Sequence, residues 1–139
     1  MITVLLVHHQ ERSEHFNVQK VNERRGRLLE KELGFNQNQI QSFHAARDEF
    51  RKKTEPLKSE LRQLNRDLIV EATSVKPDTA KCNRISLRIG EVHTQIKHMT
   101  YIHLMNVSKI ATPQQSGKMS EFFLKILNEA PSHNHHGKD

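Results

Sequence analysis

The sequence predicts an all-α protein built on an elongated hairpin of two long antiparallel helices, with shorter helices at both ends. Residues 81–110 carry apolar side chains at alternating steps of three and four, the pattern of a helix that packs lengthwise on another helix. Residues 32–71 contain a second apolar series of similar length, which supplies the partner. Apart from residues 1–7, no segment has the pattern of a β-strand, so a sheet is not expected.

The N-terminal residues 1–7 are apolar but too short to span a bilayer, which takes about 20 residues. No Lys or Arg precedes them, as it would in a complete signal peptide. A lone β-strand and the end of a membrane anchor both fit, and we prefer the anchor. We therefore expect an anchor end or disordered segment at 1–13, one helical domain at 14–130 and a His-rich mobile tail at 131–139.

The first helix is predicted over residues 15–33, with Gly34 after it in the position that favours a left-handed C-cap. Asn36 and Gln39 then form the pattern of a capping box, which opens the second helix. Phe35 and Ile40 add the hydrophobic staple that accompanies such boxes.

The second helix is expected to run to about Ala72, with a kink or break near Thr54 and Glu55 because Pro56 removes one helix hydrogen bond. Residues 73–79 form a turn, and Asp78 or Thr79 caps the third helix.

The two long helices meet along an apolar seam. Its members on the third helix are Cys82, Ile85, Ile89, Val92, Ile96, Met99, His103, Asn106 and Ile110, and those on the second are Ile40, Phe43, Phe50, Leu57, Leu61, Leu64 and Leu68. The lone cysteine excludes an internal disulfide, so we expect a buried thiol, with an intermolecular bridge as the lesser alternative.

A second capping box opens the fourth helix. Thr112 is the cap, Pro113 takes the first helical position, and Gln115 stands three residues after the cap. One face of this helix is strongly apolar, with Met119, Phe122, Phe123, Ile126 and Leu127.

The net charge of +6 favours acidic partners. However, Lys and Arg alternate with Glu and Asp along all the helices, so solvated helix faces are favoured over a nucleic-acid surface. No sequence motif of a hydrolase, nucleotide-binding loop or metalloprotease is present, and we do not expect an enzyme.

The two capping boxes resemble the paired LTxxQ motifs of the Spy/CpxP family of periplasmic proteins. The run from Ile110 to Gln115, IATPQQ, is similar to ILTPEQ, with Ala111 in place of Leu. The run from Leu33 to Gln39, LGFNQNQ, is similar to LGLTxxQ, with Phe35 for Leu and Asn36 for Thr. Residues 55–61, EPLKSEL, resemble a mid-helix pattern of membrane-anchored heavy-metal resistance relatives.

The resemblance implies a cradle-shaped periplasmic protein of four helices, a homodimer through its long helices, and no enzyme activity. Relatives hold unfolded clients without ATP, restrain an envelope signalling protein, or, in CnrX-like members, sense nickel or cobalt. For this chain we expect non-catalytic, ATP-independent binding of unfolded or signalling proteins, with a membrane-anchored sensor of a transition metal as the alternative. A cytosolic basic helical protein that binds a partner or nucleic acid is the second alternative.

Histidines raise the possibility of a metal site, although the binding of unfolded or signalling proteins requires no cofactor. Met99 and His103 are one turn apart on the third helix and His44 lies on the facing helix, a set that suits Cu(I) or nickel. His103 matches a CnrX-like ligand, but Val107 stands where that pattern has Met, so core packing is the favoured interpretation. The tail cluster His133, His135 and His136 either binds transition metals weakly or is a solvated tail.

Client binding is predicted for apolar residues that cannot all be buried. Phe122, Phe123 and Leu124 are consecutive, so one helix face cannot cover all three. Tyr101 and Leu104 lie off the seam. The alternative is that these residues pack on the first helix or on a dimer partner.

Overall fold

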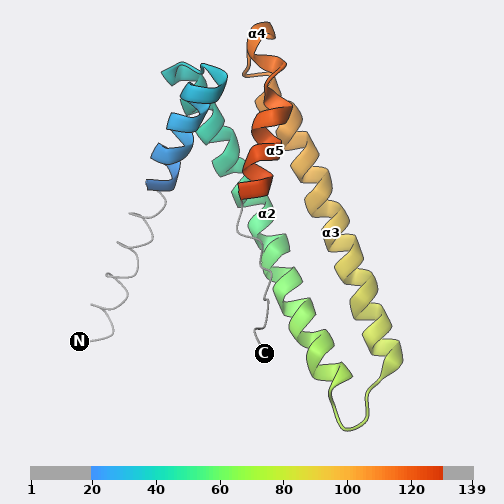
Figure 1. The fold of residues 1–139 in the computed structure, drawn as a ribbon. Coiled ribbons are helices and arrows are strands. Elements are labelled where there is room, and N and C mark those ends of the chain that lie inside the picture. Colours follow the sequence, from blue (N-terminus) through green and yellow to red (C-terminus); the bar gives the residue numbers. More distant parts are fainter. Residues whose placement is uncertain (1–19, 130–139) are drawn as a thin grey trace, which may run out of the picture. The chain divides into compact units, whose positions relative to one another are not determined.

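The computed structural model of the chain describes residues 20–129, and within this range every regular element is a helix (Figure 1). Residues 20–28 are α-helical and continue directly into the π-helix η1, Leu29–Leu33. The elements that follow are α2 (Gln37–Ala72), α3 (Thr79–Ser108), α4 (Pro113–Ser116) and α5 (Met119–Glu129). The predicted all-α class and the two long helices are confirmed.

The chain forms two compact units. One consists of residues 41–110, which include most of α2 and all of α3, and we call it the hairpin unit. The other consists, within the described residues, of 20–40 and 111–129, and we call it the terminal unit.

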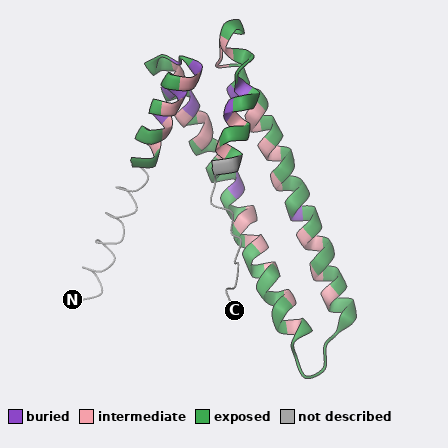
Figure 2. Cartoon of the chain, in the orientation of Figure 1, coloured by how far each residue is buried: buried purple, intermediate pink, exposed green. Residues whose placement is uncertain are grey.

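In the hairpin unit, α2 and α3 run antiparallel and pack against each other (Figure 1). Val92 is fully buried on α3, and Asn106 is exposed, although the sequence placed it on the seam. The other α3 seam residues are only half-buried, and so are Leu57, Leu61, Leu64 and Leu68 of α2 (Figure 2). Two helices cover each other on one side only, so a single layer leaves most seam residues half-buried.

Helix α2 does not break at Pro56, contrary to one of the two outcomes that the sequence suggested. The Thr54 side chain is fully buried, and its hydroxyl donates a hydrogen bond to the Phe50 carbonyl over 2.9 Å. A proline costs the helix one backbone hydrogen bond. The apolar face of α2 packs both before and after Pro56, and this packing offsets the loss.

The connector between α2 and α3 is held by one carboxylate and one cap. Glu71 accepts a hydrogen bond from the Asp78 amide over 3.0 Å and pairs with Lys81 Nζ at 3.5 Å. Asp78 caps α3 by accepting from the Lys81 amide over 3.1 Å, which confirms one of the two expected caps. The helix therefore starts at Thr79, slightly earlier than predicted.

The terminal unit has its own small core. Leu29, Leu33 and Phe35 are buried, as are Met119 and Phe122 of α5. Helix α5 packs on η1, and Lys125 forms an ion pair with Glu32.

Two helix ends in the terminal unit test the sequence interpretation. Gly34 has a φ of 68° and adopts the left-handed conformation that the sequence predicts for it. The predicted single fourth helix is instead two helices, because α4 ends at Ser116 and α5 begins at Met119 after a turn at Gly117.

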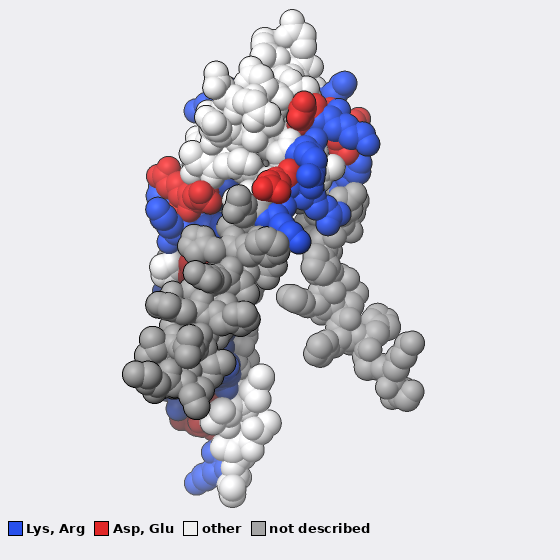
Figure 3. Space-filling view, turned by 90° about the vertical axis from the view of Figure 1, so that its left-hand side faces the viewer, with Lys and Arg blue, Asp and Glu red and all other residues white. Residues whose placement is uncertain are grey.

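The surface charges of the described residues are mixed in sign. Figure 3 shows Lys and Arg side chains next to Asp and Glu on the face that it draws. The ion pairs of the described residues include Lys53 with Glu49 and Arg62 with Glu55. None of the helices within residues 20–129 has both the length and the apolar character needed to cross a membrane.

Candidate functional site

A shallow groove runs between α2 and α3 on one side of the hairpin unit. It consists of two adjoining hollows of about 340 and 580 Å³, which share Lys53, His98 and Met99. We call it the hairpin groove and define it by the lining residues between positions 46 and 57 of α2 and between 94 and 106 of α3. Its apolar lining comes from Ala46, Phe50, Pro56, Leu57, Met99 and Ile102.

Helical periodicity explains why these residues share one side. Met99, Ile102 and Asn106 of α3 are three and four positions apart, and Phe50 and Lys53 of α2 are three apart. The groove combines seam residues, among them Phe50 and Met99, with residues beside the seam such as Ile102, which has 40% of its surface exposed.

His103 lies in the groove with its ring stacked on the ring of Phe50. The two centroids are 4.5 Å apart and the planes differ by 13°. Burial lowers the pKa of His103 below the ordinary histidine value, and the positive charge of Arg47 lowers it further. The imidazole is therefore neutral at neutral pH.

A second ring pair joins the groove residue His98 to Tyr101. The Tyr101 hydroxyl and His98 Nδ1 are 2.6 Å apart and hydrogen-bonded, and the two rings meet edge to face at 4.9 Å between centroids. Half of the Tyr101 surface is exposed.

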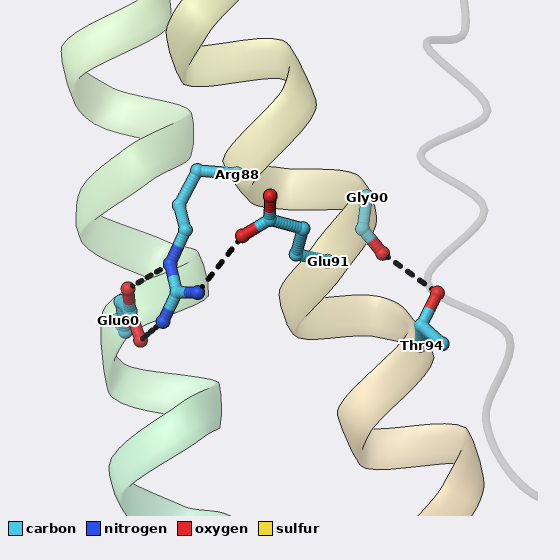
Figure 4. A network of polar contacts seen from close by, with 5 residues as sticks. All are labelled: Glu60, Arg88, Gly90, Glu91 and Thr94. Atoms are coloured by element: carbon cyan, nitrogen blue, oxygen red, sulfur yellow. Dashed lines mark hydrogen bonds and ion pairs between the residues drawn. The ribbon is translucent and has the colours of Figure 1, made fainter.

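An ion-pair network joins the two helices further along the hairpin (Figure 4). Arg88 reaches from α3 to Glu60 on α2 and donates to both of its carboxylate oxygens, over 2.7 and 3.0 Å. Arg88 also donates to Glu91 on its own helix over 3.1 Å. The hydrogen bonds from Arg88 lower the pKa of Glu60, and those to Glu60 and Glu91 raise the pKa of Arg88.

The structure brings together some of the predicted metal ligands. Met99 and His103 line the same hollow, whereas His44 does not; its ring meets Phe43 edge to face at 6.2 Å. Among residues 20–129, no group of three or more His, Cys, Asp or Glu side chains is placed to hold a metal ion. The tail histidines His133, His135 and His136 lie outside the described residues.

Both predicted capping boxes are present in the terminal unit. Gln39 N donates to Asn36 Oδ1 and Asn36 N to Gln39 Oε1, each over 2.9 Å. Gln115 N donates to Thr112 Oγ1 over 3.3 Å and Thr112 N to Gln115 Oε1 over 3.0 Å. Pro113 occupies the first turn of α4, as predicted.

The predicted client-binding residues differ in exposure. Of the three consecutive residues of α5, Phe122 is buried, Phe123 is half-buried and Leu124 is 58% exposed. Tyr101 is exposed and Leu104 is half-buried. Tyr101 adjoins the hairpin groove through His98.

Sequence reasoning did not assign Ile102 or His98 to a site. Ile102 lies three residues before Met105, and His98 lies three residues before Tyr101, so each pair shares one side of the helix beside the seam. This second, weaker series was the sequence signal that could have identified them.

No family model, curated protein or solved structure matches the chain.

Proposed function

We propose that the protein is a non-catalytic holding protein of the Spy/CpxP type, which binds apolar segments of unfolded or signalling polypeptides without ATP. The observation that carries this proposal is the hairpin groove, an apolar hollow open to solvent. Exposed Tyr101, Ile102 and Met105 extend its apolar surface along α3. Exposed apolar area of this kind, rimmed by polar residues, is typical of protein interaction sites.

The charge of the chain supports a preference for acidic clients. A net charge of +6 attracts acidic polypeptides over distances of about a Debye length, and salt screens this attraction. Charge thus increases the rate of encounter, and the groove supplies the apolar contact.

The motif resemblance supports a location in the periplasm, at the inner membrane, and a cradle-shaped homodimer joined along α3. Leu87 supports the dimer, because this apolar side chain of α3 lies outside the hairpin groove and is 70% exposed.

The test is an aggregation assay with a denatured acidic client. Stoichiometric protein should slow aggregation without nucleotide, and less well at high salt. Ile102→Asp places a charge in the groove and should weaken the effect, whereas Val70→Asp, at a residue 69% exposed and outside the groove, should not. Aggregation traces that are the same with and without the protein would contradict the holding function.

A metal-sensing role is the second candidate, supported by the placement of Met99 and His103 in one hollow. Calorimetry with Ni(II), Co(II), Cu(II) and Cu(I) on protein truncated after Ala130 separates these residues from the tail histidines. Loss of all binding on truncation would leave the tail as the only site and remove the case for His103.

A further inference from the structure

The end of the hairpin unit at which α2 turns into α3 carries exposed apolar side chains. We define the hairpin tip as residues 66–84, which comprise the end of α2, the connector and the start of α3 (Figures 1 and 2). Ile69 and Val70 lie in the last turn of α2 and are 63% and 69% exposed, and Val75 of the connector is fully exposed. Connectors of this kind usually consist of Gly, Pro, Asn, Asp or Ser, so the turn itself does not require an exposed valine. Apolar side chains that cluster in such a place are typical of a binding surface.

The hairpin tip also carries cations without acidic partners. Arg66, Lys76 and Arg84 are exposed, and none of them forms an ion pair in the part of the chain that the structure describes. Arg66 lies three and four residues before the two apolar residues of α2, so helical spacing places it on their face. Lys76 directly follows the exposed valine of the connector. Positive charge therefore adjoins the apolar cluster on both the helix and the connector.

The acidic side chains of the tip are engaged by the hairpin itself. Asp67 accepts a hydrogen bond from Gln63 Nε2 over 2.9 Å. Glu71 binds the Asp78 amide and the Lys81 ammonium group, and Asp78 caps α3. The cations that remain without partners are thus available to an anionic surface.

Polar groups at the end of α2 are hydrogen-bonded internally. Thr73 donates to the Ile69 carbonyl through its amide and its hydroxyl, over 3.0 and 2.7 Å. Ser74 donates to the Glu71 carbonyl in the same two ways, over 3.2 and 2.8 Å. Pro77 has no amide hydrogen that needs an acceptor. Removing water from this end of the hairpin therefore costs less than it would if these groups had no partners.

We propose that the hairpin tip docks end-on against an anionic lipid surface. Its exposed apolar side chains then lie between the lipid headgroups and the acyl chains, and its unpaired cations lie at the lipid phosphates. Docking of this kind needs no membrane-spanning helix. The inference goes beyond the holding function, which concerns the hairpin groove.

The arrangement of the tip favours a lipid surface over other anionic partners. Its apolar side chains protrude at the end of the hairpin, and a headgroup layer admits protruding side chains without a preformed hollow (Figure 1). The long stems of Lys and Arg let their charges stay at the phosphates while apolar neighbours lie deeper. A nucleic acid would bind the cations through its phosphates but leave the apolar cluster in water.

The absence of tryptophan from the chain makes a direct experiment possible. Val75→Trp in the full chain places one fluorescent reporter at the tip, and Met105→Trp places one at an exposed position near the other end of α3. The probe is a vesicle of phosphatidylcholine with one third phosphatidylglycerol. The emission of Val75→Trp should shift to shorter wavelength and be quenched by lipids brominated on their acyl chains. The emission of Met105→Trp should not change.

Vesicle flotation tests the contribution of each group. Val75→Asp should weaken binding by about tenfold or more, because its carboxylate would lose water beside anionic phosphates. Lys76→Gln should weaken binding by about fivefold, the contribution of one cation near such a surface. Lys97→Gln is the matched control, since this exposed cation lies about 27 Å along α3 from the start of the helix and should have no effect. Circular dichroism confirms that each variant is folded.

Three results would overturn the inference. The first is that the original protein binds the anionic vesicles no better than vesicles of phosphatidylcholine alone. The second is an emission of Val75→Trp that does not move, or one of Met105→Trp that moves as far. The third is that Val75→Asp and Lys76→Gln bind as the original protein does, which would assign the binding to another part of the chain. Failure to bind either vesicle would leave a protein as the occupant of the tip.

Val70→Asp separates this inference from the holding function. The residue lies at the tip and outside the hairpin groove. The variant should therefore lose affinity for the anionic vesicles and still slow aggregation of the client. Unchanged vesicle binding by Val70→Asp would show that the apolar cluster does not enter the lipid and would overturn the inference, whatever the aggregation assay shows.

Discussion

Gln39 and Gln115 are 76 residues apart in sequence, and Gln39 Nε2 donates a hydrogen bond to Gln115 Oε1 over 2.7 Å. Each glutamine also closes its own capping box, Gln39 with Asn36 and Gln115 with Thr112. Gln115 Nε2 donates in addition to the Gly34 carbonyl over 2.9 Å. The starts of α2 and α4 and the left-handed end of η1 thus share one hydrogen-bond network.

This shared network predicts energetic coupling between the two boxes. Gln39→Ala and Gln115→Ala should be non-additive, with an interaction energy of about 0.5 to 3 kcal/mol. A double-mutant cycle by urea unfolding measures it. Gln37→Ala, an exposed residue of the same helical turn, is the control and should add independently to Gln115→Ala. Additive glutamine substitutions would show that the 2.7 Å contact contributes nothing to stability.

The second capping box predicts a cost for losing its hydroxyl. Thr112→Ala should lower the free energy of unfolding by about 1 kcal/mol, because the Gln115 amide loses its side-chain acceptor. Thr112→Ser keeps the hydroxyl and should retain most of the stability. Urea unfolding compares the two variants. Equal stability of the alanine and serine variants would show that the Thr112 hydroxyl does not stabilise the helix start.

Replacing Gly90 by alanine is expected to stabilise α3. It lies inside α3, and a Cβ added there meets nothing within 4 Å. Gly90→Ala should therefore raise the free energy of unfolding by about 1 kcal/mol, because alanine loses less backbone entropy in a helix. Gly34→Ala should do the opposite, since its φ of 68° strains any L side chain. Thermal unfolding of both variants tests this pair.

The proposed homodimer predicts self-association through the exposed side of α3. Leu87→Asp should dissociate it, because a charge without a partner is expensive in an apolar interface. Leu87 is 70% exposed and suits this test better than half-buried Ile89 or Ile96, whose replacement would also disturb the hairpin. Sedimentation is the measurement, and an original protein that is monomeric at high micromolar concentration would refute the dimer.

His103 predicts a pH dependence of stability. Its pKa is lower in the folded chain than in the unfolded chain, where it is about 6.5. The unfolded state therefore binds the proton first, and the free energy of unfolding should fall as the pH drops below about 6.5 and level off below the folded pKa. His103→Phe should lose this part of the pH dependence in urea unfolding, whereas His93→Gln, at an exposed position of α3, should keep it.

The sequence by itself determined the two long helices and several of the helix caps. Asn36 with Gln39, Asp78 with the Lys81 amide, and Thr112 with Gln115 act over three residues, and Gly34 acts through its own backbone. Such interactions depend on local chemistry alone, so residue type and spacing are enough to predict them. The apolar seam of α3 was predictable for the same reason, because the helical period decides which side chains share a face.

Only the tertiary structure decided which of these local features meet. The Gln39–Gln115 bond, the Phe50–His103 stack and the Arg88–Glu60 pair each join residues far apart in sequence, and their formation depends on helix register. Tertiary packing also kept α2 continuous through Pro56 and left the seam half-buried, with part of it lining the hairpin groove. The physical reason is that periodicity specifies the direction in which a side chain points, whereas its burial and its partner depend on what the rest of the chain places there.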